Sequence, residues 1–249
     1  MKIVFSFIFI VLCLKPYCQE RYVSVEGQKY RIKTLGTGEI TVIFESGASD
    51  SLEVWGSLPD TIAKYARVFL YDRADIGKSD TSRQERIIPN IVNELQNILK
   101  VAEIHPPYVF VSHSFGGLIS RYFTSQNPQQ VKGLLLLDPT PEAYYNQMSK
   151  RELEKFISYG NELNRVHPPR LRKEWNQFVV NLDYMKNLKI PSDLPIILVS
   201  ASQTNLYQYQ DKIISGLSKA IHVKSEGTHY IYRDHPDLII GYIKNLLGK

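Results

Sequence analysis

The sequence predicts an α/β fold: a mostly parallel central sheet with helices on both faces and a helical insertion. Short apolar runs alternate with stretches whose apolar residues have helical spacing, a pattern typical of buried parallel strands joined by helices. The stretch between Asp138 and Pro195 breaks this alternation, since it contains no strand pattern. The 249 residues, 43% of them hydrophobic and 22% charged, suffice for one large core and exclude a disordered chain.

The N-terminal residues predict an export signal. A short basic start at Met1-Lys2 is followed by an almost uninterrupted apolar run over residues 3–14, which is a secretory signal pattern. The run is too short to span a bilayer core about 30 Å thick. We therefore expect residues 1–18 to be a signal peptide cleaved near Cys18, and the mature protein to be exported without a membrane span. A buried N-terminal helix is the alternative.

The rest of the chain predicts one hairpin, six further strands and four principal helices. Residues 22–25 and 30–33 flank a glycine and predict the hairpin. The six apolar runs that predict strands are 41–44, 68–71, 108–111, 133–137, 196–199 and 220–223. The stretches with helical spacing are 54–65, 91–99, 118–125 and 238–247.

The stretch without strands predicts a helical insertion between two core strands. Residues 151–163 and 171–182 have helical patterns and are divided by Pro168-Pro169. A structureless loop of this length is unusual in a compact domain. We expect residues 141–190 to form the insertion, and residues 19–140 and 191–249 to form the core.

Composition narrows the possible functions. Both cysteines, Cys13 and Cys18, lie in the predicted signal segment, so the mature chain offers no catalytic thiol, disulfide framework or thiolate metal site. The formal net charge of +5 comes without a run of like charges, and nucleic-acid binding is therefore not expected.

A serine lies directly between an apolar strand and a predicted helix. The run Ser112-His113-Ser114-Phe115-Gly116 has the pattern small-x-Ser-x-Gly, which is typical of a tight turn that lifts a hydroxyl off the sheet. Ser114 is therefore the candidate nucleophile. A serine hydroxyl needs a base to take its proton and an acid to orient that base.

His229 is the candidate base. It lies in a glycine-containing loop between the last predicted strand and the last helix, from which a side chain can reach the C-terminal edge of a parallel sheet. The chain order nucleophile, acid, histidine also requires a late histidine, and His235 is assigned instead to the start of the helix. The backbone N–H groups of Ala48 and Phe115, in two strand-to-turn segments, are the expected donors to an oxyanion.

Four ordered motifs resemble those of the α/β-hydrolase family, over nearly the whole mature chain. The matching segments are Phe44-Glu45-Ser46-Gly47 with Trp55 (oxyanion loop), Tyr71-Asp72-Arg73-Ala74-Asp75-Ile76-Gly77-Lys78-Ser79-Asp80 (strand and loop), Ser112-His113-Ser114-Phe115-Gly116-Gly117 (nucleophile elbow) and Gly227-Thr228-His229-Tyr230 (histidine loop). The oxyanion loop of the family usually has His-Gly, and Asp75 and Ser112 stand where glycine is commoner. The resemblance implies that the insertion corresponds to the family's helical lid.

The position of the acid departs from the commonest pattern of the family. Many members carry it after the strand that corresponds to residues 196–199, but this chain has no carboxylate there until Asp211. Some relatives place the acid after the preceding strand, where Asp138 ends an apolar run. We expect Asp138 to be the acid, with Asp211 as the alternative.

The resemblance and the candidate residues predict a serine hydrolase that acts on carboxylic esters or related acyl compounds. We expect a small-molecule acyl substrate, an acyl-enzyme, and neither metal nor organic cofactor. The elbow serine disfavours the haloalkane dehalogenase and epoxide hydrolase branches, which use a carboxylate nucleophile. A peptidase or aminopeptidase of the same fold is the first alternative, with Glu152, Glu154 or Glu162 binding a substrate amine. A non-catalytic ligand-binding protein is the second.

Overall fold

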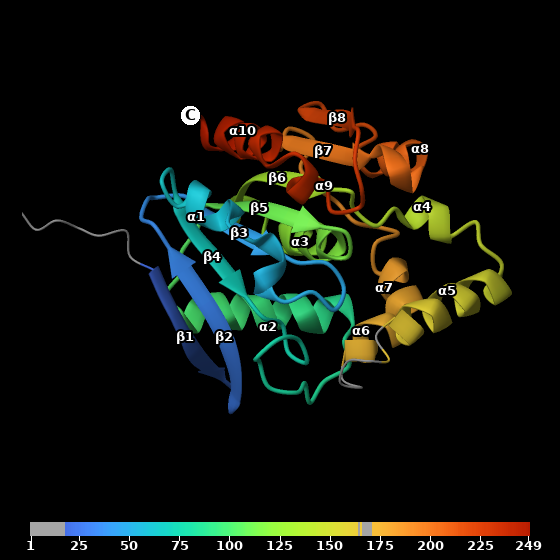
Figure 1. Ribbon diagram of the computed structural model, residues 1–249, viewed down its shortest axis with the longest axis horizontal. Coiled ribbons are helices and arrows are strands. Elements are labelled where there is room, and N and C mark those ends of the chain that lie inside the picture. The colour runs from blue at the N-terminus through green and yellow to red at the C-terminus, as the bar shows by residue number, and fades with distance from the viewer. Residues whose placement is uncertain (1–17, 164, 166–170) are drawn as a thin grey trace, which may run out of the picture.

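The computed structural model describes residues 18–163, 165 and 171–249, and these contain an eight-stranded sheet (Figure 1). The strands are β1 (Cys18–Val25), β2 (Gln28–Leu35), β3 (Thr41–Glu45), β4 (Arg67–Tyr71), β5 (Tyr108–His113), β6 (Val131–Leu137), β7 (Ile196–Ala201) and β8 (Ala220–Ser225). Their spatial order is β1-β2-β4-β3-β5-β6-β7-β8. β2 pairs antiparallel with both β1 and β4, and the other neighbouring pairs are parallel. The predicted fold class is confirmed.

The predicted signal peptide lies outside the described residues, except that β1 already begins at Cys18. The helices are α1 (Leu58–Ile62), α2 (Ile88–Val101), α3 (Gly116–Gln126), α4 (Glu142–Tyr145), α5 (Lys150–Leu163), α6 (Arg172–Asn176), α7 (Phe178–Asp183), α8 (Tyr207–Gln210), α9 (Ile231–Asp234) and α10 (Pro236–Leu247). Short 3₁₀ helices occupy Leu52–Trp55, Pro128–Gln130, Ser202–Thr204 and Asp211–Ile213.

Two predicted helices are wrong in extent. The stretch 54–65 forms a 3₁₀ turn and the short α1, separated by Gly56, whose φ of 56° no helix accommodates. The stretch 171–182 forms α6 and α7, which meet at Gln177, a residue that is not helical. In both places the apolar spacing is right, but a local backbone break divides the helix.

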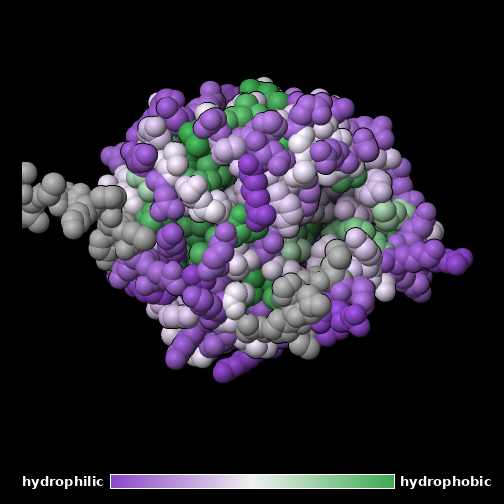
Figure 2. Space-filling view, in the orientation of Figure 1, coloured by the Kyte–Doolittle hydropathy of each residue, from purple (hydrophilic) through white to green (hydrophobic). Residues whose placement is uncertain are grey.

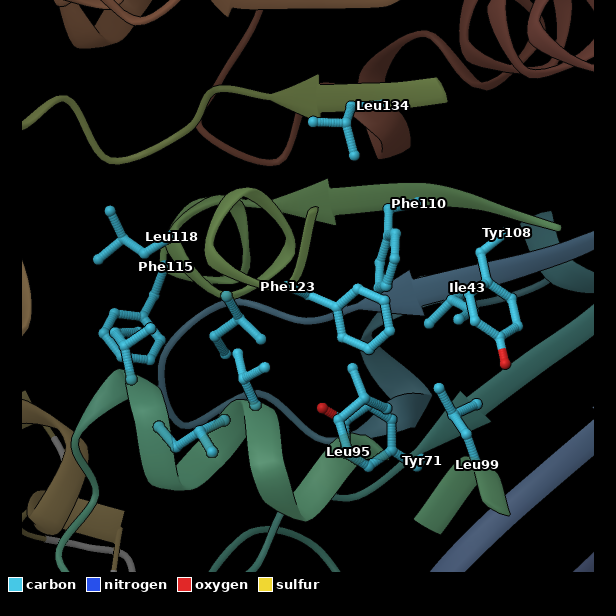
Figure 3. Packing of buried hydrophobic residues seen from close by; sticks show 14 of the residues in the cluster. Ile43, Tyr71, Leu95, Leu99, Tyr108, Phe110, Phe115, Leu118, Phe123 and Leu134 are labelled. Atoms are coloured by element: carbon cyan, nitrogen blue, oxygen red, sulfur yellow. The ribbon is translucent and has the colours of Figure 1, made fainter. Parts of the chain in front are cut away.

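Each face of the sheet has its own hydrophobic core. Along β5, Tyr108 and Phe110 pack with α2 and α3, whereas Val109 and Val111 pack on the opposite face with α1 and α10. Figure 3 shows the first core, where the rings of Phe110 and Phe123 lie 5.1 Å apart between the strands and α2. Because both faces of the central strands β3 to β7 are covered, these strands are largely apolar, which is why their runs predicted them. The edge strand β8 is only partly buried.

The insertion contributes α4 to α7, which lie together on the right of Figure 1 between β6 and β7 in the chain. Polar side chains attach it to the core: Lys173 of α6 donates to Asp75 Oδ1 at 2.9 Å. Asn181 of α7 accepts from the Ile88 N–H and donates to the Arg86 carbonyl. These contacts fix α6 and α7 on the core.

The face of the molecule seen in Figure 2 is predominantly polar. Figure 2 shows hydrophilic residues over most of one face, with hydrophobic ones in small separate areas. Within the described part of the chain, no helix combines the length and the apolar character needed to cross a membrane.

Candidate active site

Ser114 lies in a sharp turn between β5 and α3. Its φ is 52°, and its N–H donates to the Leu137 carbonyl at 3.1 Å. The turn brings the chain so close to β3 that a Cβ on Gly116 would lie 2.4 Å from the Glu45 carbonyl oxygen. The glycine of the elbow pattern is thus required by this approach, while Ser112, where the family commonly has glycine, is fully buried within β5.

His229 and Asp138 meet at the C-terminal edge of the sheet. His229 Nδ1 lies 2.6 Å from Asp138 Oδ2, and Asp138 is almost completely buried after β6. Asp138 Oδ1 accepts from the Ala201 N–H, the Thr204 hydroxyl and the Gln210 side-chain amide. Because a carboxylate oxygen can only accept, His229 carries its proton on Nδ1 and presents Nε2 as a base.

Asp211, the alternative acid, contacts a histidine other than His229. Asp211 Oδ1 lies 3.0 Å from Nδ1 of a different histidine, His222. The structure therefore contains two histidine–carboxylate pairs, and it places Asp138, not Asp211, beside His229.

One cavity contains the residues that the sequence singled out. Its volume is about 190 Å³. It is lined by Ala48, Ser114, Phe115, Asp138, Pro139, Thr140, Tyr145, Phe156, Trp175, Phe178, Leu206 and His229. Besides Asp138 and His229, the one ionisable side chain of this lining is Tyr145, and burial raises the pKa of its phenol above the usual value. The cavity can therefore hold an apolar, uncharged group.

The backbone N–H groups of Ala48 and Phe115 are unused. Neither donates to another residue of the described ranges, and both residues line the cavity next to Ser114. Arg73 holds the loop that carries Ala48, because its guanidinium donates to the carbonyls of Ser46 at 2.9 Å and Gly47 at 2.7 Å. Two free amides at one edge of the cavity can bind a negatively charged oxygen.

Arg73 also binds two buried carboxylates, one in the core and one in the insertion. It donates to Glu45 of β3 at 2.9 Å and to Glu174 of α6 at 2.7 and 3.0 Å, and Glu174 accepts the Ser49 N–H. Burial raises the pKa of Glu45 to about 7 against the lowering effect of Arg73. Burial acts in the same direction on Glu174, but Arg73 outweighs it and holds the pKa below its usual value. Glu45 and Arg73 lie in two of the matched motifs, but no sequence pattern pairs them with Glu174.

His113 contacts the backbone of the loop that carries His229. Its Nε2 lies 2.9 Å from the His229 carbonyl, and burial lowers its pKa well below the usual value. The neutral ring therefore donates from Nε2. Its Nδ1 faces Asp50 Oδ2 at 3.9 Å, which is too long for a hydrogen bond, and burial raises the pKa of Asp50 to about 6.

The raised pKa of Asp50 predicts a pH-dependent stability. The folded protein binds the Asp50 proton more tightly than the unfolded chain, so stability falls as the pH rises from about 4 through about 6. Asp50→Asn should remove this dependence on pH. The free energy of unfolding of the variant, relative to that of the parent, should therefore rise between about pH 4 and about pH 6 and be constant above that range. Urea unfolding at several pH values measures the effect. Parallel stability curves for parent and variant would show that Asp50 is not responsible.

The carboxylates considered for amine binding do not line the cavity. Glu152 accepts from the Ser149 hydroxyl, Glu154 pairs with Lys150, and Glu162 pairs with Arg165, all at exposed positions. His235 precedes α10 as predicted, with Nε2 2.7 Å from the Glu226 carbonyl. Within residues 18–163, 165 and 171–249, no group of three His, Cys, Asp or Glu side chains has an arrangement that could hold a metal ion.

A family model described as the alpha/beta hydrolase fold matches residues 40–234. The chain belongs to the α/β-hydrolase fold family. It is 26% identical to the uncharacterized protein YqjL of Bacillus subtilis (strain 168), over 91% of each chain. Among solved structures, the epoxide hydrolase CorEH matches with a TM-score of 0.74 at 12% identity, over 93% of this chain and 99% of that one.

The enol-lactonase from Burkholderia xenovorans LB400 matches with a TM-score of 0.68 at 13% identity, over 92% of this chain and 100% of that one. At such identities the structural likeness establishes the fold alone. The family match confirms the α/β-hydrolase resemblance that the motifs indicated, and the solved structures agree with it in fold.

Proposed function

We propose that this α/β-hydrolase fold protein is a serine hydrolase that cleaves carboxylic esters of small, uncharged acyl groups. The observation that carries the proposal is the 2.6 Å contact between His229 Nδ1 and Asp138 Oδ2, in the cavity that Ser114 also lines. A serine at the elbow distinguishes the site from one with a carboxylate nucleophile.

The proposed reaction is acyl transfer to water in two steps. His229 Nε2 takes the Ser114 proton as the hydroxyl oxygen attacks the ester carbonyl, and Asp138 stabilises the resulting imidazolium. The amides of Ala48 and Phe115 bind the developing oxyanion. His229 then returns the proton to the leaving alcohol, and a water molecule attacks the acyl-enzyme in the same way to release the carboxylic acid.

The cavity lining favours a neutral apolar substrate. Four of the residues that line the cavity are aromatic residues of the insertion: Tyr145, Phe156, Trp175 and Phe178. An apolar cavity of about 150 Å³ can hold benzene, so about 190 Å³ corresponds to a group of roughly six to eight carbon atoms. No carboxylate other than Asp138 lines this cavity within the described residues, which disfavours capture of a substrate amine and supports esters over aminoacyl amides.

The test is covalent labelling with a fluorophosphonate probe. We expect the parent to be labelled at one site and Ser114→Ala to take no label, because the phosphonate reacts with an activated serine. Circular dichroism verifies that both proteins are folded. A folded parent that stays unlabelled would rule out the serine hydrolase and favour the non-catalytic alternative.

A substrate panel then separates esters from amides. We expect turnover of p-nitrophenyl esters from acetate to octanoate and little turnover of aminoacyl p-nitroanilides. Ser114→Ala serves as the background control. Faster turnover of the anilides would replace the esterase by the peptidase alternative.

A further inference from the structure

A chain of hydrogen bonds runs from Asp138 toward the protein surface. Gln210, which is fully buried, donates from Nε2 to Asp138 Oδ1 at 2.9 Å and to the Pro139 carbonyl at 2.9 Å. Its Oε1 accepts from the hydroxyl of Ser200, which is also fully buried. The Ser200 oxygen in turn lies 2.7 Å from His222 Nε2. The chain ends at Asp211, whose side chain is 63% exposed.

The partners fix the orientation of Gln210. A carboxylate and a backbone carbonyl can only accept, so the amide nitrogen must face Asp138 and Pro139. The amide oxygen then faces Ser200, which must donate its single proton to it. Ser200 has no second proton and accepts from His222 Nε2.

Contacts on both sides of Ser200's partner His222 fix the position of its ring. Its Nδ1 faces the Asp211 carboxylate, and its ring stacks on Tyr207 with a centroid separation of 3.9 Å and an angle of 8°. The ring is thus fixed in position and in plane. It faces an acceptor at each nitrogen, and it donates to both only when each nitrogen carries a proton. If His222 donated only to Asp211, Ser200 would have to turn its proton away from Gln210, and the Gln210 oxygen would lose its donor.

The same atoms do not form a second nucleophilic site. Ser200, His222 and Asp211 have the contacts of a triad, but the Ser200 hydroxyl is fully buried within β7 and does not line the cavity. A substrate carbonyl has no access to it. The function of the contacts has to lie in what Gln210 does next to Asp138.

We propose that Gln210 is the positioning residue of Asp138, and that His222 keeps Gln210 in place through Ser200. This proposal rests on the proposed function, because it assigns a support to the acid of that site. The strand end that carries the acid in many family members here supplies donors to an acid on the neighbouring strand: the Ala201 N–H, the Thr204 hydroxyl and Gln210. Held by three donors, Asp138 presents its other oxygen to His229.

The experiment compares Gln210→Met, which keeps the side-chain length without its donors, with His222→Phe, which keeps the stacking ring. The matched control is Gln96→Met, the same substitution at a glutamine that donates from Nε2 to Asn127 Oδ1 and does not line the cavity. We expect Gln210→Met to lower kcat for ester turnover about tenfold with KM within about twofold, because a hydrogen bond to a charged group is lost. His222→Phe should have a smaller effect in the same direction.

The double variant tests the chain itself. If His222 acts through Gln210, Gln210→Met combined with His222→Phe should lose no more activity than Gln210→Met alone. Additive losses, or a KM change without a kcat change, would overturn the proposal.

A second readout needs no substrate. The NMR signal of the proton on His229 Nδ1 reports the hydrogen bond to Asp138, and we expect it to move or broaden in Gln210→Met and to stay unchanged in Gln96→Met. An unchanged signal in Gln210→Met would overturn the proposal even where esters are turned over. Conversely, a changed signal in a protein that takes no fluorophosphonate label would leave the support of Asp138 standing and refute the serine hydrolase.

Discussion

Asp138→Asn is expected to lower kcat for ester hydrolysis by about 10⁴-fold. Three donors face Oδ1 of this residue, so the oxygen of an asparagine would stay there and its NH₂ group would face His229 Nδ1. Two donors cannot share a hydrogen bond, and His229 would move its proton to Nε2. It could then no longer take the proton of Ser114, although the fold would be intact.

Stopped-time assays with an aryl ester measure this loss, with Asp211→Asn and Asp183→Asn as comparisons. Asp211 lies at the far end of the Gln210 chain, and its loss should cost no more than about tenfold. Asp183 pairs with Lys186 on the surface, and its loss should have no effect. An effect of Asp211→Asn as large as that of Asp138→Asn would assign the acid to Asp211.

The fold could be predicted from the sequence because the central strands β3 to β7 are almost entirely buried. The six apolar runs all lie within observed strands, and the glycine-separated runs form the expected hairpin of β1 and β2. The divided helices could not be predicted from spacing, because Gly56 and Gln177 interrupt the backbone without interrupting the apolar pattern.

The places of Ser114 and His229 in the site could be predicted as well, but the choice of the acid and the residue that positions it could not. Ser114 lies in a turn whose glycine pattern is contiguous in the chain, and His229 lies in a loop of defined order. The choice between Asp138 and Asp211 depends on which histidine each carboxylate reaches, and that is set by packing across β6, β7 and β8. Gln210 lies 72 residues from Asp138 in the chain and carries no motif.

The cluster of Arg73, Glu45 and Glu174 predicts the largest loss of stability. All three side chains are at most 2% exposed, and Arg73→Met would leave two buried carboxylates without their cation. We expect the free energy of unfolding at pH 7 to fall by about 3 to 5 kcal/mol, as when one partner of a buried pair is removed. Arg165→Met, at an exposed pair with Glu162, should change it by less than about 1 kcal/mol.

The pH dependence identifies the cause of that loss. Without Arg73, the buried carboxylates bind protons more tightly in the folded protein than in the unfolded chain, so acidification stabilises the variant relative to the parent. Urea unfolding should therefore show that the difference in free energy of unfolding between the parent and Arg73→Met narrows as the pH is lowered. The triple variant that adds Glu45→Gln and Glu174→Gln should recover part of the lost stability at neutral pH. A difference independent of pH would mean that lost packing, not charge, is the cause.

The same cluster connects the stability of the insertion to the site. Glu174 lies on α6 and binds both Arg73 and the Ser49 N–H, while Arg73 holds the carbonyls of Ser46 and Gly47. Moving α6 away from the core would separate buried charges, which is costly. We therefore expect Arg73→Met to reduce kcat through the displaced Ala48 amide, even at temperatures where the variant is fully folded. Ester turnover measured well below its melting temperature tests this, and parent-like kcat there would show that the oxyanion loop keeps its shape without Arg73.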